Sequence, residues 1–162
     1  MAPIRRLKST LAEPDGALSL NRATVDDSDF AFDMKTAAFR PYVEQSLGWD
    51  EVAQRQQHQH NFARHDYRVI TVDGAARGIM SLAVASGCVK VNQLFLAPEY
   101  QGDGIVARCM ALIIAEAESL GLPVRLRVMK VNPRAKAFYE RLDFSVVSEV
   151  ETHFMMERAL AS

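Results

Sequence analysis

The sequence has 162 residues, a formal net charge of -1, and 49% hydrophobic and 24% charged side chains. This composition is typical of one compact globular domain and excludes a disordered or fibrous chain. Its 19 Lys and Arg are matched by 20 Asp and Glu, which argues against a nucleic-acid partner, because affinity for a phosphate backbone depends on clustered positive charge.

Cysteine content and hydropathy indicate the compartment. Cys88 and Cys109 are too few for the disulfide framework of a secreted domain, and both lie in apolar runs typical of buried residues. No window approaches the roughly 18 continuous apolar residues of a membrane-spanning helix. No apolar segment of signal-peptide length follows the basic residues 1–8. We expect a cytoplasmic protein with no membrane partner, with a transit peptide as the weaker alternative for this start.

The first third of the chain predicts a tail, a strand and two helices. Residues 1–16 show no sustained period and are expected to form a flexible tail, which leaves 17–158 as the domain. Alternation over 18–23 predicts a strand. Acidic capping residues and apolar residues at helical spacing follow, and Pro41 is expected to end or kink that helix. A polar helix is predicted over 50–62.

The remaining elements follow in a regular order. Strands are predicted over 67–72, 78–84 and 89–96, a helix over 105–120, a strand over 124–128, a helix from Asn132 to Leu142, and strands over 144–150 and 152–156. The Asp-Gly pair at 73–74 is a strong hairpin signal. The order β-α-α-β-β-β-α-β-α-β-β predicts a single α/β domain with a mixed sheet.

One loop has the features of an anion site. Gly102 and Gly104 lie between a strand and a helix start, where free amides and the helix dipole favour negative charge. Glycines there let the backbone approach a phosphate closely. The alternative is a plain tight turn, because two glycines match neither a Walker loop nor a full dinucleotide fingerprint.

A second segment strengthens the phosphate interpretation. Asn132 and Tyr139 are seven residues apart in a predicted helix and therefore share a face, with the small Ala135 between them. The alternative is that Asn132 only caps the helix and Tyr139 is a half-buried aromatic residue.

The two segments together resemble the GNAT acyl-CoA-dependent N-acyltransferases. The stretch Gln101-Gly-Asp-Gly-Ile-Val106 is similar to the Arg/Gln-x-x-Gly-x-Gly/Ala loop of that family. Residues 132–144 are similar to its Asn-x-x-Ala-x-x-x-Tyr-x-x-x-Gly-Phe segment, and the order of elements fits from about residue 18 to residue 156.

The resemblance implies an enzyme that transfers the acetyl group of acetyl-CoA directly to a primary amine, without a metal. It implies a GNAT-like sheet with two splayed parallel strands at the acyl-CoA site, and Tyr139 as general acid at the thioester sulfur. The implied cofactor contacts are Leu94, Phe95, Leu96, Gln101, Gly102, Asp103, Gly104, Ile105, Val106, Asn132 and Ala135. A homodimer is compatible with such a domain, and the sequence indicates no interface for it.

Three residues depart from the family pattern. Val106 and Asp143 replace small residues, and the charge of Asp103 opposes a phosphate ligand. Val106 and Asp103 motivate an alternative function, a catalytically impaired module that binds or senses acetyl-CoA.

The general base is less well defined. His153 and Glu44 are candidates, as is a water molecule held by such groups. His153 has the alternative of an ordinary packed or hydrogen-bonded histidine. His58, His60 and His65 have no cysteines or carboxylates at ligand spacing, so a solvated polar helix is expected there and no metal site.

The acceptor is expected to contact residues 39–51, which resemble the Arg-Pro-Tyr and Gly-Trp-Asp-Glu stretch of one GNAT subgroup. The candidate acceptor residues are Arg40, which suits a carboxylate, and Tyr42, Glu44, Trp49 and Gln93. They predict a small, carboxylated amine. Tyr42 and Trp49 as ordinary core residues, and acetylation of a protein amino terminus, are the alternatives.

Overall fold

The strands form one mixed sheet in the computed structural model, which describes residues 6–46 and 48–161. Their order is β1-β2-β3-β4-β5-β6-β8-β7, and within the described residues only β5 and β6 pair in parallel. The strands are β1 (Thr10–Ala12), β2 (Leu18–Arg22), β3 (Asp66–Val72), β4 (Ala75–Ala85), β5 (Cys88–Leu96), β6 (Val124–Met129), β7 (Ser145–Glu149) and β8 (His153–Arg158). The predicted mixed α/β fold is confirmed.

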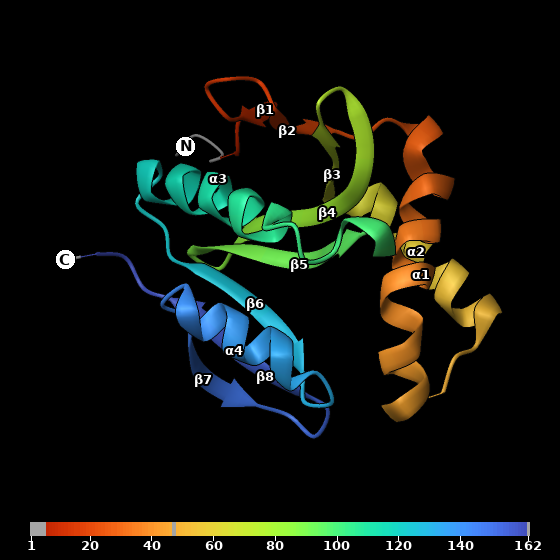
Figure 1. Cartoon of the computed structure of the whole chain (residues 1–162). Coiled ribbons are helices and arrows are strands. Elements are labelled where there is room, and N and C mark those ends of the chain that lie inside the picture. The colour runs from red at the N-terminus through yellow and green to blue at the C-terminus, as the bar shows by residue number, and fades with distance from the viewer. Residues whose placement is uncertain (1–5, 47, 162) are drawn as a thin grey trace.

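Helices cover both faces of the sheet (Figure 1). The α-helices are α1 (Ser28–Ser46), α2 (Glu51–Arg64), α3 (Ile105–Ser119) and α4 (Pro133–Arg141), and two short 3₁₀ helices are η1 (Val25–Asp27) and η2 (Pro98–Tyr100). Successive strand residues face opposite sides, so Met80 of β4 packs in the core below α3, while Ile79 packs with Ala31 of α1. The sheet therefore separates two apolar cores.

Residues 6–16 are not a flexible tail, and the prediction is corrected there. Leu7 and Leu11 are buried in the α3-side core, and β1 pairs antiparallel with β2. Burial of two leucines and pairing with a neighbouring strand offset the entropy of ordering this short segment. Residues 1–5 of the predicted tail lie outside the described residues.

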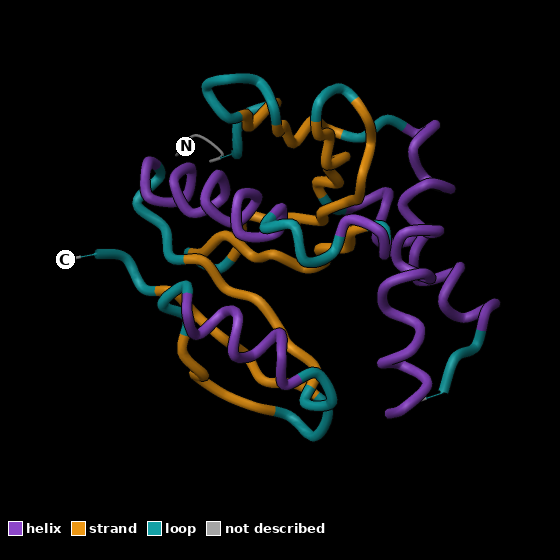
Figure 2. Tube along the Cα trace, viewed as in Figure 1, coloured by secondary structure: helices purple, strands orange, loops and turns teal. Residues whose placement is uncertain are grey.

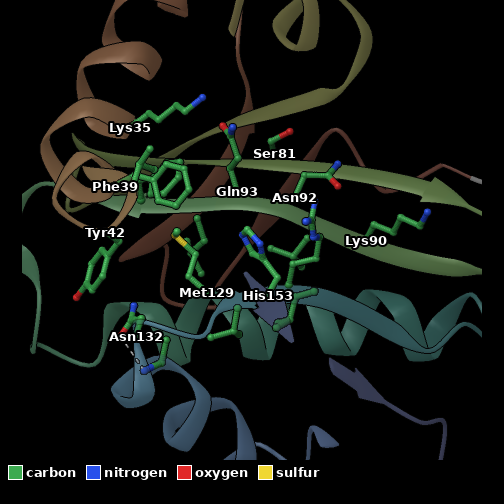
Figure 3. A pocket seen from close by; sticks show the side chains of 18 of the residues that line it. Lys35, Phe39, Tyr42, Ser81, Lys90, Asn92, Gln93, Met129, Asn132 and His153 are labelled. Atoms are coloured by element: carbon green, nitrogen blue, oxygen red, sulfur yellow. Dashed lines mark hydrogen bonds between the residues drawn. The ribbon is translucent and has the colours of Figure 1, made fainter. Parts of the chain in front are cut away.

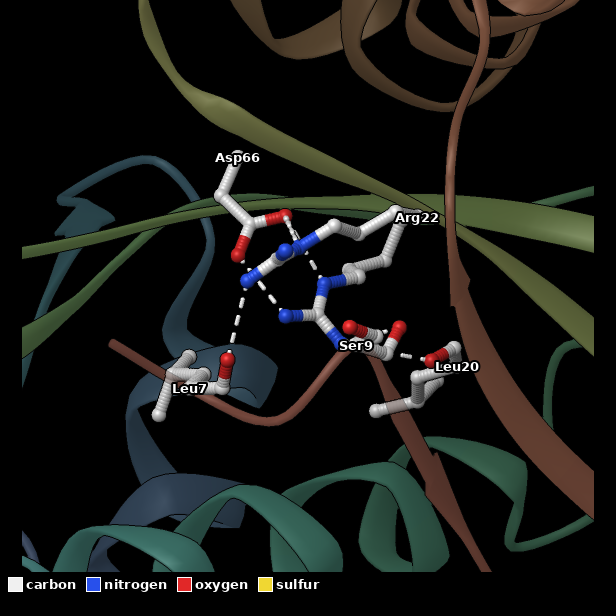
Figure 4. A network of polar contacts seen from close by, with 6 residues as sticks. Leu7, Ser9, Leu20, Arg22 and Asp66 are labelled. Atoms are coloured by element: carbon white, nitrogen blue, oxygen red, sulfur yellow. Dashed lines mark hydrogen bonds and ion pairs between the residues drawn. The ribbon is translucent and has the colours of Figure 1, made fainter.

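A buried arginine fastens this N-terminal segment to the sheet (Figure 4). Arg68 is 0% exposed, and its guanidinium donates to both carboxylate oxygens of Asp66, at 2.8 Å each. It also donates to the carbonyl of Ser9 at 3.3 Å. Arg22 donates to the carbonyl of Leu7 at 2.9 Å. The strand order thus depends on contacts between residues far apart in sequence, which no local period reveals.

Pro41 was predicted to end or kink the first helix, and the first of these two effects is wrong, because α1 continues through Pro41. The proline lacks the N–H that would bond to the carbonyl of Ala37, and both residues are exposed, so water can satisfy that carbonyl. The helix ends at Ser46, two residues before Gly48, whose N–H donates to the carbonyl of Val43 at 3.0 Å and whose φ is +75°. A left-handed glycine is the usual helix stop.

The parallel strands β5 and β6 separate along their length (Figure 2). They pair only between residues 89–91 and 124–126, whereas β5 continues to Leu96 and β6 to Met129. A bulge lies at the point of separation, since Ser81 of β4 faces Gln93 and the next pair skips Asn92. Because a bulge bends its strand and increases the local twist, it turns β5 away from β6.

Gly78 of β4 pairs with Leu96 in the part of β5 that diverges from β6, and the two backbones approach closely there. A Cβ at this position would lie 2.2 Å from the carbonyl oxygen of Phe95 and 3.0 Å from Cα of Leu96. We expect Gly78→Ala to lower the free energy of unfolding by about 2 kcal/mol, since backbone must shift to admit the methyl group. Urea unfolding measures this, and a variant as stable as the parent would contradict the close approach.

None of the helices within the described ranges combines the length and apolar character needed to cross a bilayer.

Candidate active site

A pocket of about 630 Å³ lies where β5 and β6 separate (Figure 3). Its volume is in the range of small-molecule sites. Side chains from both layers of helices and from the strands line it, among them Lys35, Phe39, Tyr42, Gln54, Ser81, Asn92, Gln93, Met129, Asn132, Ala135, Tyr139 and His153. The gap between the strands thus joins the α1 and α2 side of the sheet to the α4 side.

Topology places two helix N-termini at this gap. Helix α3 follows the C-terminal end of β5, and α4 follows the C-terminal end of β6 (Figure 1). Gly104 is the N-cap of α3 with φ +75° and no side-chain cap. Asn132 caps α4, because its Oδ1 accepts from the N–H of Ala135 at 3.2 Å. Asn132 therefore caps its helix and also lines the pocket.

Tyr139 enters the pocket from α4. Its ring packs edge-on against Phe138 and Phe144, with centroids 5.1 Å and 5.6 Å away. Burial raises the pKa of Tyr139 to about 12. Among the described residues its hydroxyl has no hydrogen-bond partner. The phenol therefore stays protonated across the physiological range and can donate a hydrogen bond to a ligand.

His153 lines the same pocket from the first position of β8, opposite Met129 of β6. Burial lowers the pKa of His153, and the nearby Arg127 lowers it further. The imidazole is therefore neutral at pH 7. Its Nδ1 lies 2.7 Å from Oγ1 of Thr152, so the tautomer with the proton on Nδ1 leaves Nε2 as a proton acceptor.

The other predicted cofactor residues divide between the pocket and the loop before α3. Leu94 and Phe95 line the pocket, while Leu96 is buried in the core. Residues 101–104 form an exposed loop outside the pocket lining, followed by Ile105 and Val106 at the start of α3. Gln101 Nε2 donates to the carbonyl of Leu96 at 3.3 Å. Arg108, a candidate to offset the charge of Asp103, is already bound to Glu13 at 2.6 Å.

The predicted acceptor residues are also divided. Tyr42 and Gln93 line the pocket, and Arg40, Glu44 and Trp49 do not. Arg40 Nε donates to Glu44 at 2.7 Å, and its guanidinium lies 5.5 Å from the centre of the Trp49 ring. The three side chains thus form a cluster of their own at the C-terminal end of α1.

Several residues that line the pocket were not predicted from the sequence, and two of them, Lys35 and Ser81, are buried polar residues. Lys35 is 2% exposed and Ser81 is 0% exposed, and both line the pocket. A helical projection of α1 gives a signal for the first, since Lys35 is four residues from both Ala31 and Phe39 and so shares their inward face. Nothing in the strand sequence distinguishes Ser81 from a solvated serine.

The prediction that α2 is a solvated polar helix is only partly correct, because His58 is buried. His58 is 2% exposed, and its Nε2 lies 3.1 Å from the hydroxyl of Ser28. It packs among the rings of Phe32, Phe62 and Tyr67, so it anchors α2 to α1. No group of three His, Cys, Asp or Glu side chains suited to a metal ion occurs in the described part of the chain.

Comparison with known proteins identifies the family. The sequence profile of the acetyltransferase (GNAT) family matches residues 30–144, which include both helix starts, Asn132 and Tyr139. The chain belongs to this family. Over 85 residues, 52% of its length, this GNAT chain is 34% identical to an uncharacterized N-acetyltransferase of Mycobacterium tuberculosis (strain ATCC 25618 / H37Rv), of which 51% is covered. It therefore spans about half the length of the curated relatives it matches.

Solved structures agree on the GNAT fold. The PaiA N-acetyltransferase of Thermoplasma acidophilum, solved in complex with coenzyme A, superposes with a TM-score of 0.72 over 88% of this chain and 98% of that one, at 14% identity. The ribosomal-protein-S18-alanine N-acetyltransferase of Escherichia coli gives 0.67 over 90% and 96%, at 17% identity. At these identities the likeness concerns the fold alone.

Proposed function

We propose that this chain is an N-acetyltransferase that transfers the acetyl group of acetyl-CoA directly to the primary amine of a small acceptor. The observation that carries the proposal is the pocket between the separated strands, because it connects Tyr139 on the α4 side with a polar cavity below α1 and α2. The family membership supports the reaction class, and the pocket volume of about 630 Å³ supports a small acceptor.

The described residues fit a CoA ligand in two respects. Beyond Val91, the edge of β5 that faces β6 has no described strand paired to it, so an extended amide-bearing chain can pair with its backbone. The first turn of α3 has amides that no side-chain cap occupies, and such amides bind phosphate. We propose that the edge of β5 binds the pantetheine arm and that residues 101–106 bind the diphosphate.

The remaining pocket residues have separate proposed tasks. Acetyl-CoA supplies an acetyl group activated as a thioester: the amine nitrogen bonds to the carbonyl carbon, the carbon–sulfur bond breaks, and an amide and a thiol result. Tyr139 gives its proton to the departing sulfur as general acid and regains a proton from solvent. His153, which is neutral at pH 7, accepts the proton that the nitrogen loses, directly or through water. No covalent intermediate is needed, and burial raises the pKa of the Cys109 thiol to about 12.

Calorimetric titration of acetyl-CoA, with ATP as the control nucleotide, tests the cofactor site. We expect saturable micromolar binding of acetyl-CoA and none of ATP. Release of free thiol in the presence of an amine panel then tests the reaction, and a peptide with a free amino terminus is included because the E. coli neighbour is named for a protein substrate. Absence of acetyl-CoA binding would overturn the proposal, and turnover on the peptide alone would move the acceptor to a protein amino terminus.

Asp103 gives a further prediction at the same loop. It is exposed and has no described ion-pair partner, so its charge opposes a diphosphate bound at the start of α3. We expect Asp103→Asn to tighten acetyl-CoA binding about threefold at low salt, with a smaller gain at high salt because exposed charges are screened. Calorimetry at two ionic strengths measures this. Asp26→Asn, an exposed change on η1, serves as the matched control, and an equal gain there would refute a local effect.

A further inference from the structure

Lys35 is a buried cation that lacks a partner. Its side chain extends from α1 into the pocket, and it is 2% exposed (Figure 3). No described residue forms a hydrogen bond or ion pair with its ammonium group. Burial lowers the pKa of Lys35. Because an unpaired buried charge is unfavourable for folding, packing alone does not account for it, whereas a negatively charged ligand does.

The lining of the pocket is cationic. Among the described lining residues, Lys35, Lys90, Arg125 and Arg127 carry positive charge, and none is Asp or Glu. Arg125 is bound to Glu157, and the other three have no described ion-pair partner. The pocket therefore favours an anionic group and holds no carboxylate to compete with it.

Neutral donors adjoin Lys35 on the same side of the sheet. The hydroxyl of Tyr67 donates to Oε1 of Gln93 at 3.2 Å, which leaves the amide Nε2 of Gln93 available to donate. The hydroxyl of Ser81 is buried beside the phenol of Tyr67 and makes no well-aligned hydrogen bond. In Figure 3, Lys35, Gln93 and Ser81 lie along one side of the pocket. A buried hydroxyl without a well-aligned partner is costly, and a carboxylate oxygen would give it one.

We propose that the acceptor amine also carries a carboxylate, and that Lys35 binds this carboxylate with Gln93 and Ser81 as neutral donors. Lys35 is thus assigned the task for which the sequence suggested Arg40, which is instead bound to Glu44 outside the pocket lining. The inference rests on the proposed acetyltransferase function and adds the class of its acceptor, an amino acid or a similar small amino carboxylate.

Paired acceptors test this assignment directly. Amino acids and their carboxamides share a side chain and an amino group but differ in the charge that Lys35 would bind. With acetyl-CoA saturating, thiol release by the full chain gives kcat and KM for each pair. We expect kcat/KM to favour at least one amino acid over its carboxamide by about tenfold or more, as charged hydrogen bonds in a buried site allow.

Two substitutions of Lys35 separate anion binding from proton transfer. Lys35→Met should raise KM for the amino acid about tenfold or more and leave the carboxamide nearly unaffected, whereas Lys35→Arg, which keeps the charge, should recover part of the preference. Lys8→Met, an exposed change outside the pocket, is the matched control. Thermal unfolding adds a readout without substrate, since removing an unpaired buried cation should maintain or raise the melting temperature.

Each outcome decides the inference. A preference for carboxamides over amino acids would overturn the inference. A Lys35→Met variant whose kcat falls equally on both members of a pair would also overturn it, and would indicate that Lys35 acts as a base instead. Acetylation of neutral amines only would overturn the acceptor class while the proposed function stands. If acetyl-CoA binds but no small amine or peptide is acetylated, the proposed function itself fails with it.

Discussion

Replacing Tyr139 by phenylalanine should lower kcat about 100-fold while leaving the dissociation constant of acetyl-CoA within about twofold. The change removes only the hydroxyl, because the ring remains packed against Phe138 and Phe144. That hydroxyl has no described hydrogen-bond partner to lose. Assays of thiol release measure kcat, and calorimetry separately measures the dissociation constant of acetyl-CoA.

A matched control is available in Tyr100. Its hydroxyl accepts from Arg77 and lies outside the pocket lining, so Tyr100→Phe should leave kcat unchanged. Equal losses in both variants would indicate a general effect of removing a phenol. Full turnover in Tyr139→Phe would exclude the tyrosine as donor to the sulfur. A chain that binds acetyl-CoA and never turns over, with or without the substitution, would support the alternative of a sensing module.

The pH dependence of Tyr139 follows from burial. Because its pKa is raised to about 12, the hydroxyl keeps its proton and no alkaline loss of its donor capacity is expected below about pH 11. An alkaline fall in kcat near pH 9 would point to a different group.

Removal of Asp66 should destabilise the domain by about 3 kcal/mol, which for a chain of this size lowers the melting temperature by roughly 10 °C. The carboxylate accepts two hydrogen bonds from the fully buried Arg68 and lies 3.8 Å from Arg22. In Asp66→Ala, the guanidinium of Arg68 stays buried without its counter-charge. Thermal and urea unfolding measure the loss.

The double variant Asp66→Ala with Arg68→Met distinguishes an unpaired charge from lost packing. Because removing both partners eliminates the buried charge, part of the stability should return. Asp33→Ala, an exposed change on α1, should alter the free energy of unfolding by less than about 0.5 kcal/mol. If the double variant is less stable than Asp66→Ala, the contacts of Arg68 with backbone carbonyls matter more than the ion pair.

The order of the elements and part of the pocket lining were accessible from the sequence because their determinants are local. The central and C-terminal elements follow from local patterns. Apolar residues at a period of 2 predicted the strands, those at a period of 3.6 predicted the helices, and the Asp-Gly pair at 73–74 predicted the hairpin. Asn132 and Tyr139 share a helix face by spacing alone, and both line the pocket. Gly104 before α3 is likewise a feature of a few adjacent residues.

The determinants that the sequence did not reveal are long-range. Strand β1 exists because Leu7 and Leu11 find a core below α3 and because Arg68 reaches back to Ser9. A period calculated over a few residues contains no information about such partners. Pro41 is similar, because whether it ends α1 depends on the solvent around Ala37 and not on the proline alone.

The sequence by itself therefore determined the α/β fold, the GNAT motifs and the residues on the α4 side of the site. Only the tertiary structure decided which side chains share the pocket. It brought Lys35 of α1 and Ser81 of β4 together beside Gln93 and left Arg40 outside, bound to Glu44. The physical reason is that the bulge at Asn92 and the separation of β5 from β6 create the cavity, and burial within it sets the charge and hydrogen-bonding needs of those side chains.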